Sequence, residues 1–184
     1  MKKMLCIMMY GWVAASVWAQ NIDGVAAVVN SEVITFSEIK EELGDLELDL
    51  RSKFTGALLV EKVKEARRNA LEKLVNDRLI VQAFHKKGYF LSDKVIDERL
   101  NRIIEQKYSG NLSSLVKEIN QQGLNLEEFR RTLGDGIIIH AMRSKHVYEK
   151  IRARTKEVTQ EEVNNEKQLW INELRGEAYI KFHF

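Results

Sequence analysis

Few side chains in this sequence of 184 residues are suited to catalysis or metal binding. Its four histidines are His85, His140, His146 and His183. His140 and His146 are six residues apart, which turns them to opposite sides of a helix, whereas a zinc-binding pair prefers a spacing of three or four. We therefore expect structural or surface histidines and no metal site.

Nucleophilic and phosphate-binding motifs are also missing. The single cysteine, Cys6, lies in the leader described below, and no serine has G-x-S-x-G around it. Gly134-Asp135-Gly136 lacks the strand and the glycine spacing of a phosphate loop. The carboxylates have the spacing of solvated helix faces, and an acid–base pair among them is left open. We expect no catalytic residue and no cofactor.

Residues 1–19 have the pattern of a secretory signal peptide. Lys2 and Lys3 precede the uncharged stretch 4–19, which ends with small residues three positions and one position before a cut between Ala19 and Gln20. Sixteen residues fall short of the ~20 that span a bilayer. We expect an exported protein with no membrane span in the mature chain.

The composition bounds the class of the mature protein. The sequence is 45% hydrophobic and 30% charged, which is too apolar for a disordered chain and sufficient for one core. Removing the leader leaves 27 basic and 27 acidic residues and no cysteine. This balance disfavours nucleic acid as a partner, and a chain without cysteine suits an oxidising compartment.

The hydrophobic periodicity predicts the elements that would position any site. A β-hairpin is expected over 24–35, and a capping box at Thr35 and Glu38 opens a first helix that runs to about Arg51. Further helices are expected over about 59–87, 92–110, 111–123, 125–154 and 159–176, and a strand over 178–184. Capping boxes at 125–128 and 159–162 are expected to open the last two of these helices.

A lone strand cannot satisfy its own backbone, and a lone hairpin is marginally stable. We therefore predict that the C-terminal strand pairs with the N-terminal hairpin. The predicted fold is mainly α, with about six helices and a small antiparallel sheet that joins the two ends of the chain.

Four segments resemble the SurA-type periplasmic chaperones. The opening DGVAAVVNSEVIT over 23–35 is similar to the start of that family's N-terminal domain, and residues 71–80 and 123–130 continue the similarity. Residues 170–180 resemble the family's C-terminal segment. The family usually carries parvulin isomerase domains before that segment, and this sequence has no room for one there.

The resemblance implies a chaperone core over residues 20–184, located in the periplasm and lacking the isomerase modules. It would bind unfolded polypeptides without ATP, with outer-membrane proteins as the expected clients. Two alternatives stay open, namely a peptidyl-prolyl isomerase and an adaptor for a separate isomerase. A dimer is also left open.

Three aromatic residues, Phe54, Tyr89 and Phe90, sit at expected helix ends, where apolar side chains are hard to bury. We predict that they form a client-binding patch, and core or staple roles are the alternative.

Charge is unevenly distributed along the chain. Residues 38–50 carry a net charge of −5, and residues 130–156 carry +6. We interpret these segments as solvated helix faces that attract each other in the fold. The alternative is a basic face that meets an anionic membrane or acidic clients.

Overall fold

The structure, a computed structural model, describes residues 24–152 and 159–183. The expected leader and its cleavage site lie outside the described residues. In chain order the elements are β1 (Val25–Val29), β2 (Glu32–Thr35), α1 (Phe36–Leu43), α2 (Leu46–Lys53), α3 (Gly56–Lys86), α4 (Asp93–Tyr108), α5 (Leu112–Gln121), α6 (Leu126–Arg152), α7 (Gln160–Gly176) and β3 (Ile180–Phe182). The fold is mainly α, as the sequence predicts.

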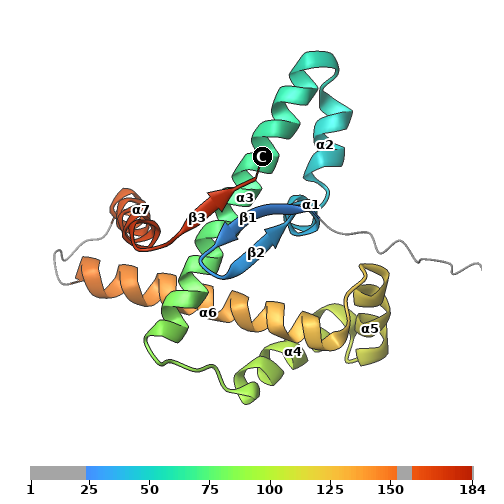
Figure 1. The fold of residues 1–184 in the computed structure, drawn as a ribbon. Coiled ribbons are helices and arrows are strands. Elements are labelled where there is room, and N and C mark those ends of the chain that lie inside the picture. Colours follow the sequence, from blue (N-terminus) through green and yellow to red (C-terminus); the bar gives the residue numbers. More distant parts are fainter. Residues whose placement is uncertain (1–23, 153–158, 184) are drawn as a thin grey trace, which may run out of the picture.

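The sheet joins the two ends of the described chain (Figure 1). Its strand order is β2-β1-β3, and both pairings are antiparallel. Val29 pairs with Ile180, and Ala27 pairs with Phe182. The predicted pairing between the N-terminal hairpin and the C-terminal strand is confirmed. It supplies β3 with the backbone partners that a lone strand would lack.

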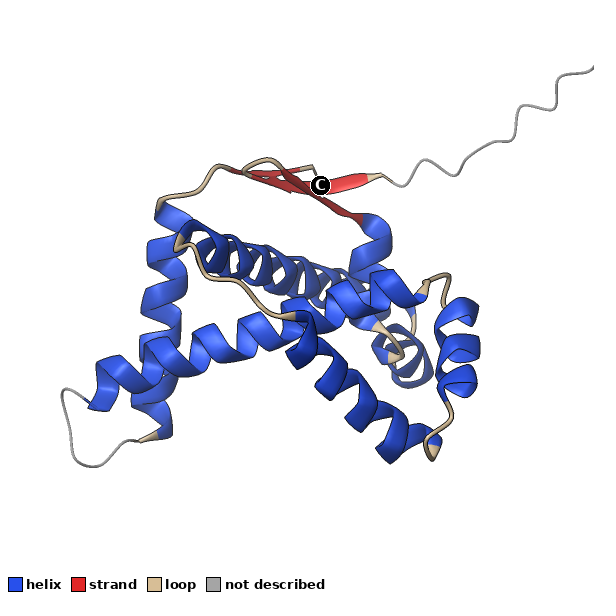
Figure 2. Ribbon diagram, turned by 90° about the horizontal axis from the view of Figure 1, so that it is seen from below, coloured by secondary structure: helices blue, strands red, loops and turns tan. Residues whose placement is uncertain are grey.

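The long helix α3 is the element on which the others assemble. One face of the sheet packs on it, and Val29 and Ile34 share a buried cluster there with Leu71 and Val75. Figure 2 shows the sheet at one side of the molecule, with the helices on its other side. A single face of the sheet is therefore buried, which is typical of antiparallel sheets.

Two further apolar clusters hold the remaining helices. The first joins α3, α6 and α7 through Ile80, Met142 and Trp170. The second joins α4 and α5 through Ile104 and Leu115, with partly buried side chains of α6 packed against them. The helix α6 therefore contributes to both clusters. No helix among the described residues has the length and apolar composition of a membrane span.

The expectation of one helix from Thr35 to about Arg51 is wrong. The chain breaks at Gly44, whose φ of +48° lies in a region that side chains with a Cβ rarely adopt. Gly44 donates from its backbone to Lys40 and Glu41 and closes α1. A separate helix, α2, then follows. This division gives the described chain seven helices, one more than the sequence indicated.

The predicted capping boxes are present. Thr35 and Glu38 exchange two hydrogen bonds, from Glu38 N to Thr35 Oγ1 (3.2 Å) and from Thr35 N to Glu38 Oε2 (2.8 Å). The same arrangement opens α6 over 125–128 and α7 over 159–162. These bonds satisfy backbone amides that a helix start leaves without partners.

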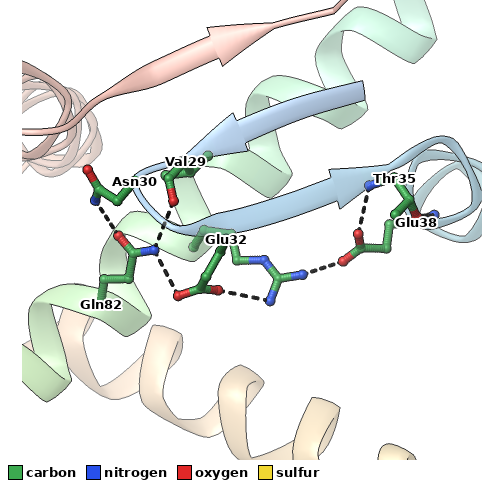
Figure 3. A network of polar contacts seen from close by, with 7 residues as sticks. Val29, Asn30, Glu32, Thr35, Glu38 and Gln82 are labelled. Carbon is green, nitrogen blue, oxygen red and sulfur yellow. Dashed lines mark hydrogen bonds and ion pairs between the residues drawn. The ribbon is translucent and has the colours of Figure 1, made fainter. Parts of the chain in front are cut away.

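A polar network ties α3 to the β1–β2 hairpin (Figure 3). Asn30 Nδ2 donates to Gln82 Oε1 (2.6 Å), and Gln82 Nε2 donates to Glu32 Oε1 (2.8 Å). Asn30 Oδ1 also accepts a hydrogen bond from the backbone of Tyr179 (2.9 Å). The hairpin turn is therefore held by α3 on one side and by the segment entering β3 on the other.

The acidic segment 38–50 and the basic segment 130–156 do not pair with each other among the described residues. Both pair with α3 instead. Arg143 of α6 binds Asp77 (2.7 Å). The acidic side chains bind α3 as three ion pairs, which are Glu38 with Arg78, Glu42 with Lys73 (2.6 Å) and Glu47 with Arg67 (3.0 Å). No ion pair therefore joins the two segments within the described ranges 38–50 and 130–152.

Candidate functional site: an aromatic groove at the end of α3

The turn that ends α3 positions the aromatic residues. Gly88, with φ +71°, follows the last residues of the helix. Its backbone donates to His85 (2.9 Å), and the backbone of Tyr89 donates to Phe84 (3.3 Å). This pair of bonds is a Schellman motif, which satisfies the last carbonyls of a helix. The turn therefore presents Tyr89 and Phe90 at a defined place.

Tyr89 and Phe90 have different roles in this turn. The ring of Tyr89 packs edge-on against Phe84, with ring centroids 5.6 Å apart, which is the apolar contact that accompanies a Schellman motif. Tyr89 is 41% exposed, whereas Phe90 is 82% exposed. Tyr89 thus closes the helix end as well as lining the surface. Phe90 leaves most of its side chain in water.

A groove of about 440 Å³ lies between this turn and α6. Its size is within the range of ligand pockets in proteins. Met142 is 5% exposed. The groove residues are Phe84, Gly88, Tyr89, Phe90, Ala141, Met142 and Lys145. Most of them are apolar, so the groove offers contact area to an apolar side chain.

One cation lies at the groove. The Nζ atom of Lys145 is 3.5 Å from Tyr89 Oη and 5.1 Å from the centroid of the Tyr89 ring. A cation over an aromatic face is attracted by about 0.5–1 kcal/mol at an exposed site. This contact holds the Lys145 ammonium beside the apolar surface.

Phe54 does not belong to this groove. It is the C-cap residue of α2, immediately before the start of α3, whereas Tyr89 and Phe90 follow the end of α3. Residues 56 and 84 are separated by about 40 Å along a straight helix. Two of the three predicted contact residues therefore come together, and the third lies at the opposite end of the molecule's longest helix.

No predicted site includes Ala141, Met142 or Lys145, which also line the groove. A signal was available, since Met142 is the only methionine after the expected leader, and methionine adapts well to irregular apolar partners. The sequence could not show that this part of α6 faces the end of α3. That proximity arises from the packing of the cluster that contains Ile80 and Met142.

Two other hollows are less suited to binding. One of about 580 Å³ lies along α5 alone, from Leu112 to Gln121. The other, of about 340 Å³, separates α2 from α3, and the ion pair between Glu42 and Lys73 lies at its side. Of these three hollows in the described part of the chain, the groove at Phe90 alone combines two exposed aromatic rings with apolar side chains from a second helix.

The histidines do not form a catalytic or metal site in the described part of the chain. His85, His140 and His183 are exposed. The ring of His146 stacks on Trp170, with centroids 4.6 Å apart, and its Nε2 lies 3.4 Å from Glu166. His146 therefore packs α6 against α7. No group of three or more potential metal ligands is found among the described residues.

Fold and groove define a class of protein, namely a helical domain closed by a sheet from both chain ends, with an apolar surface groove. The model of the SurA N-terminal domain family matches residues 22–143, which is more than half of the chain. The chain belongs to the SurA N-terminal domain family.

Curated relatives carry the same family name. The chain is 27% identical over 128 residues to "Chaperone SurA" of Bordetella pertussis, covering 70% of this chain and 24% of that protein. It is 27% identical over 141 residues to that of Legionella pneumophila (77% and 32%). It is 26% identical over 172 residues to that of Nitrosococcus oceani (94% and 38%).

The last of these similarities reaches beyond the part matched by the family model, because 172 aligned residues cannot fit within the first 143. The chain spans about a quarter to two fifths of the length of these relatives. In this chain α6 and α7 are separated by residues 153–159 only, which is too short a segment to form a domain.

Proposed function

We propose that this chain is an ATP-independent periplasmic chaperone that holds unfolded polypeptides, including outer-membrane proteins. The observation that carries this proposal is the largely exposed Phe90 beside an apolar groove. The curated relatives named Chaperone SurA support the holding of unfolded chains. Residues 20–184 would act as one chaperone core.

The proposed mechanism is physical. An unfolded client exposes apolar side chains, and burying them in the groove contributes about 25 cal/mol per Å² of apolar area removed from water. A groove of this size accepts one or two side chains, so each contact is weak. The client is therefore shielded from aggregation and is released without an energy source.

The test is the suppression of aggregation of a chemically unfolded β-barrel protein, followed by light scattering. We expect the mature chain to lower the rate of aggregation, and Phe90→Ala to lose much of this effect. Leu169→Ala, which removes an apolar side chain that is 56% exposed on α7, is the matched control and should retain it. No suppression at several-fold molar excess would contradict the proposal.

The client contact of Phe54 is tested in the same assay with Phe54→Ala. If both ends of α3 bind client, combining this substitution with Phe90→Ala should reduce suppression further than either substitution alone. An unchanged effect of Phe54→Ala would limit client binding to the groove at Phe90.

Export and enzymatic activity have direct tests. Mass spectrometry of the protein from a periplasmic fraction should give an N-terminus at Gln20, and an intact Met1 in the cytosol would contradict export. We expect no acceleration of isomerisation of a proline-containing peptide. Acceleration would instead favour the peptidyl-prolyl isomerase.

A further inference from the structure

The groove at Phe90 has a charged side as well as an apolar lining. Among the described residues, no carboxylate lies within ion-pair distance of Lys145, whose recorded contacts are with the ring and hydroxyl of Tyr89. Glu149 lies one turn further along α6, and no hydrogen bond or ion pair joins it to Lys145. The Lys145 ammonium is thus held at the groove and remains available to an anion.

A second lysine lies at the turn that ends α3. Lys87, the residue before Gly88, is exposed and forms no ion pair within the described part of the chain. Glu177, an acidic residue bound at the end of α3, is already paired with Lys86 (3.0 Å).

We propose that the groove selects extended polypeptide segments in which an apolar or aromatic side chain and an Asp or Glu are two residues apart, in either order. This inference rests on the proposed function, since it names the class of segment that the same groove binds. The apolar side chain packs beside Phe90 against the ring of Tyr89. The carboxylate pairs with Lys145.

The spacing follows from the geometry of an extended chain. Residues i and i+2 point to the same side and lie about 6.6 Å apart. The Lys145 ammonium lies 5.1 Å from the Tyr89 ring centroid, so one side chain against that ring places the next side chain on the same face within reach of the cation. The apolar contact supplies most of the affinity, and the ion pair determines the preferred sequence.

The experiment uses three fluorescent peptides with the same apolar anchor and with Glu, Gln or Lys at both positions two residues away from it. Fluorescence anisotropy with the mature chain measures their dissociation constants. We expect the Glu peptide to bind about two- to fivefold more tightly than the Gln peptide, as for an exposed ion pair, and the Lys peptide to bind most weakly. The differences should shrink in 0.5 M salt.

Two charge reversals complete the test. Lys145→Glu should invert the order, so that the Lys peptide binds best. Lys64→Glu, at an exposed position about 36 Å along α3 from the groove, should keep the original order. Circular dichroism and thermal unfolding check that both variants are folded.

The outcomes separate this inference from the proposed function. Equal affinity of the three peptides for the unchanged chain, or an unchanged order in Lys145→Glu, overturns the charge preference and leaves the chaperone proposal standing. If none of the peptides binds, the groove preference is overturned, and the chaperone proposal fails with it only if the mature chain also does not suppress aggregation.

Discussion

Asn30 has a backbone φ of +55° at the turn of the β1–β2 hairpin, a conformation that asparagine tolerates better than most residues. Its side chain also donates to Gln82 and accepts from the backbone of Tyr179. One residue therefore satisfies a conformational requirement and joins three elements by hydrogen bonds. These two contributions are separable by substitution.

Replacing Asn30 by Gly keeps the turn and removes the two side-chain hydrogen bonds, so we expect a loss of about 1–2 kcal/mol in the free energy of unfolding. Replacing it by Ala adds the cost of a left-handed backbone, about 1–2 kcal/mol more. Urea unfolding measures both. Equal losses for the two variants would show that the backbone conformation contributes nothing.

Asp135 of α6 gives a prediction for pH dependence. Burial raises the pKa of its carboxyl above the ordinary value, against an opposing effect of Arg78 that lowers the pKa. The folded chain therefore holds this proton more tightly than the unfolded chain, so stability falls as pH rises between the ordinary pKa and the raised one. Above the raised pKa, the free energy of unfolding is lowered by the full cost of burying the charged Asp135 carboxylate.

We therefore expect Asp135→Asn to be more stable than the unchanged protein at pH 7, with a gain that disappears below pH ~4, where the group is protonated in both states. Glu47→Gln should change stability in the opposite direction at pH 7, because hydrogen bonds from Arg51 and Arg67 lower the pKa of Glu47. Urea midpoints at the two pH values test both. A gain at pH 7 that persists undiminished at low pH would refute the assignment to burial.

At the scale of the elements, the packing of β3 depends on side chains that alternate between the two faces of the sheet. Ile180 is partly buried and packs on the cluster beneath the sheet, while Lys181 is exposed. The backbone of His183 donates to Ala26 (2.9 Å), which extends the pairing of β3 with β1 by one bond. This short strand therefore packs against the edge of the core through Ile180.

We expect Ile180→Ser to lower the free energy of unfolding by about 1–3 kcal/mol, as for other losses of apolar packing. Lys181→Ser, one residue away on the opposite face, should change it by less than about 0.5 kcal/mol. Thermal or urea unfolding of both variants gives the comparison. Similar losses at the two positions would mean that β3 contributes through its backbone alone.

The parts of the whole molecule differ in how many buried apolar clusters stabilise them. The helices α4 and α5 share their own cluster and pack on α6, whereas α3 takes part in the clusters with the sheet and with α6 and α7. A small cluster attached through one helix opens more readily than the central one. The two ends of the chain meet on the more strongly supported part.

Native-state hydrogen exchange should therefore show backbone amides of α4 and α5 exchanging at least about tenfold faster than those of α3 over residues 71–80, since a tenfold difference corresponds to only ~1.4 kcal/mol. Mass spectrometry of peptides from each region measures this. Equal protection would indicate that the molecule opens as one cooperative unit.

Many of the structural elements of this protein could be predicted from the sequence alone. Helical periodicity, the capping boxes at Thr35 and Thr159, and the alternation after Ala178 are local properties, and each correctly predicted an element. The pairing of the two chain ends was also predictable, because unpaired backbone groups at both ends require partners. The family resemblance rested on the same residues.

Only the tertiary structure decided which surfaces meet. Gly44 divides the first predicted helix because its backbone adopts a positive φ in this fold, which glycine permits and does not require. The acidic segment pairs with α3, and Met142 and Lys145 join Phe90, because the buried clusters fix how the helices cross. Such contacts depend on the packing of side chains distant in sequence, so no local pattern in the chain contains them.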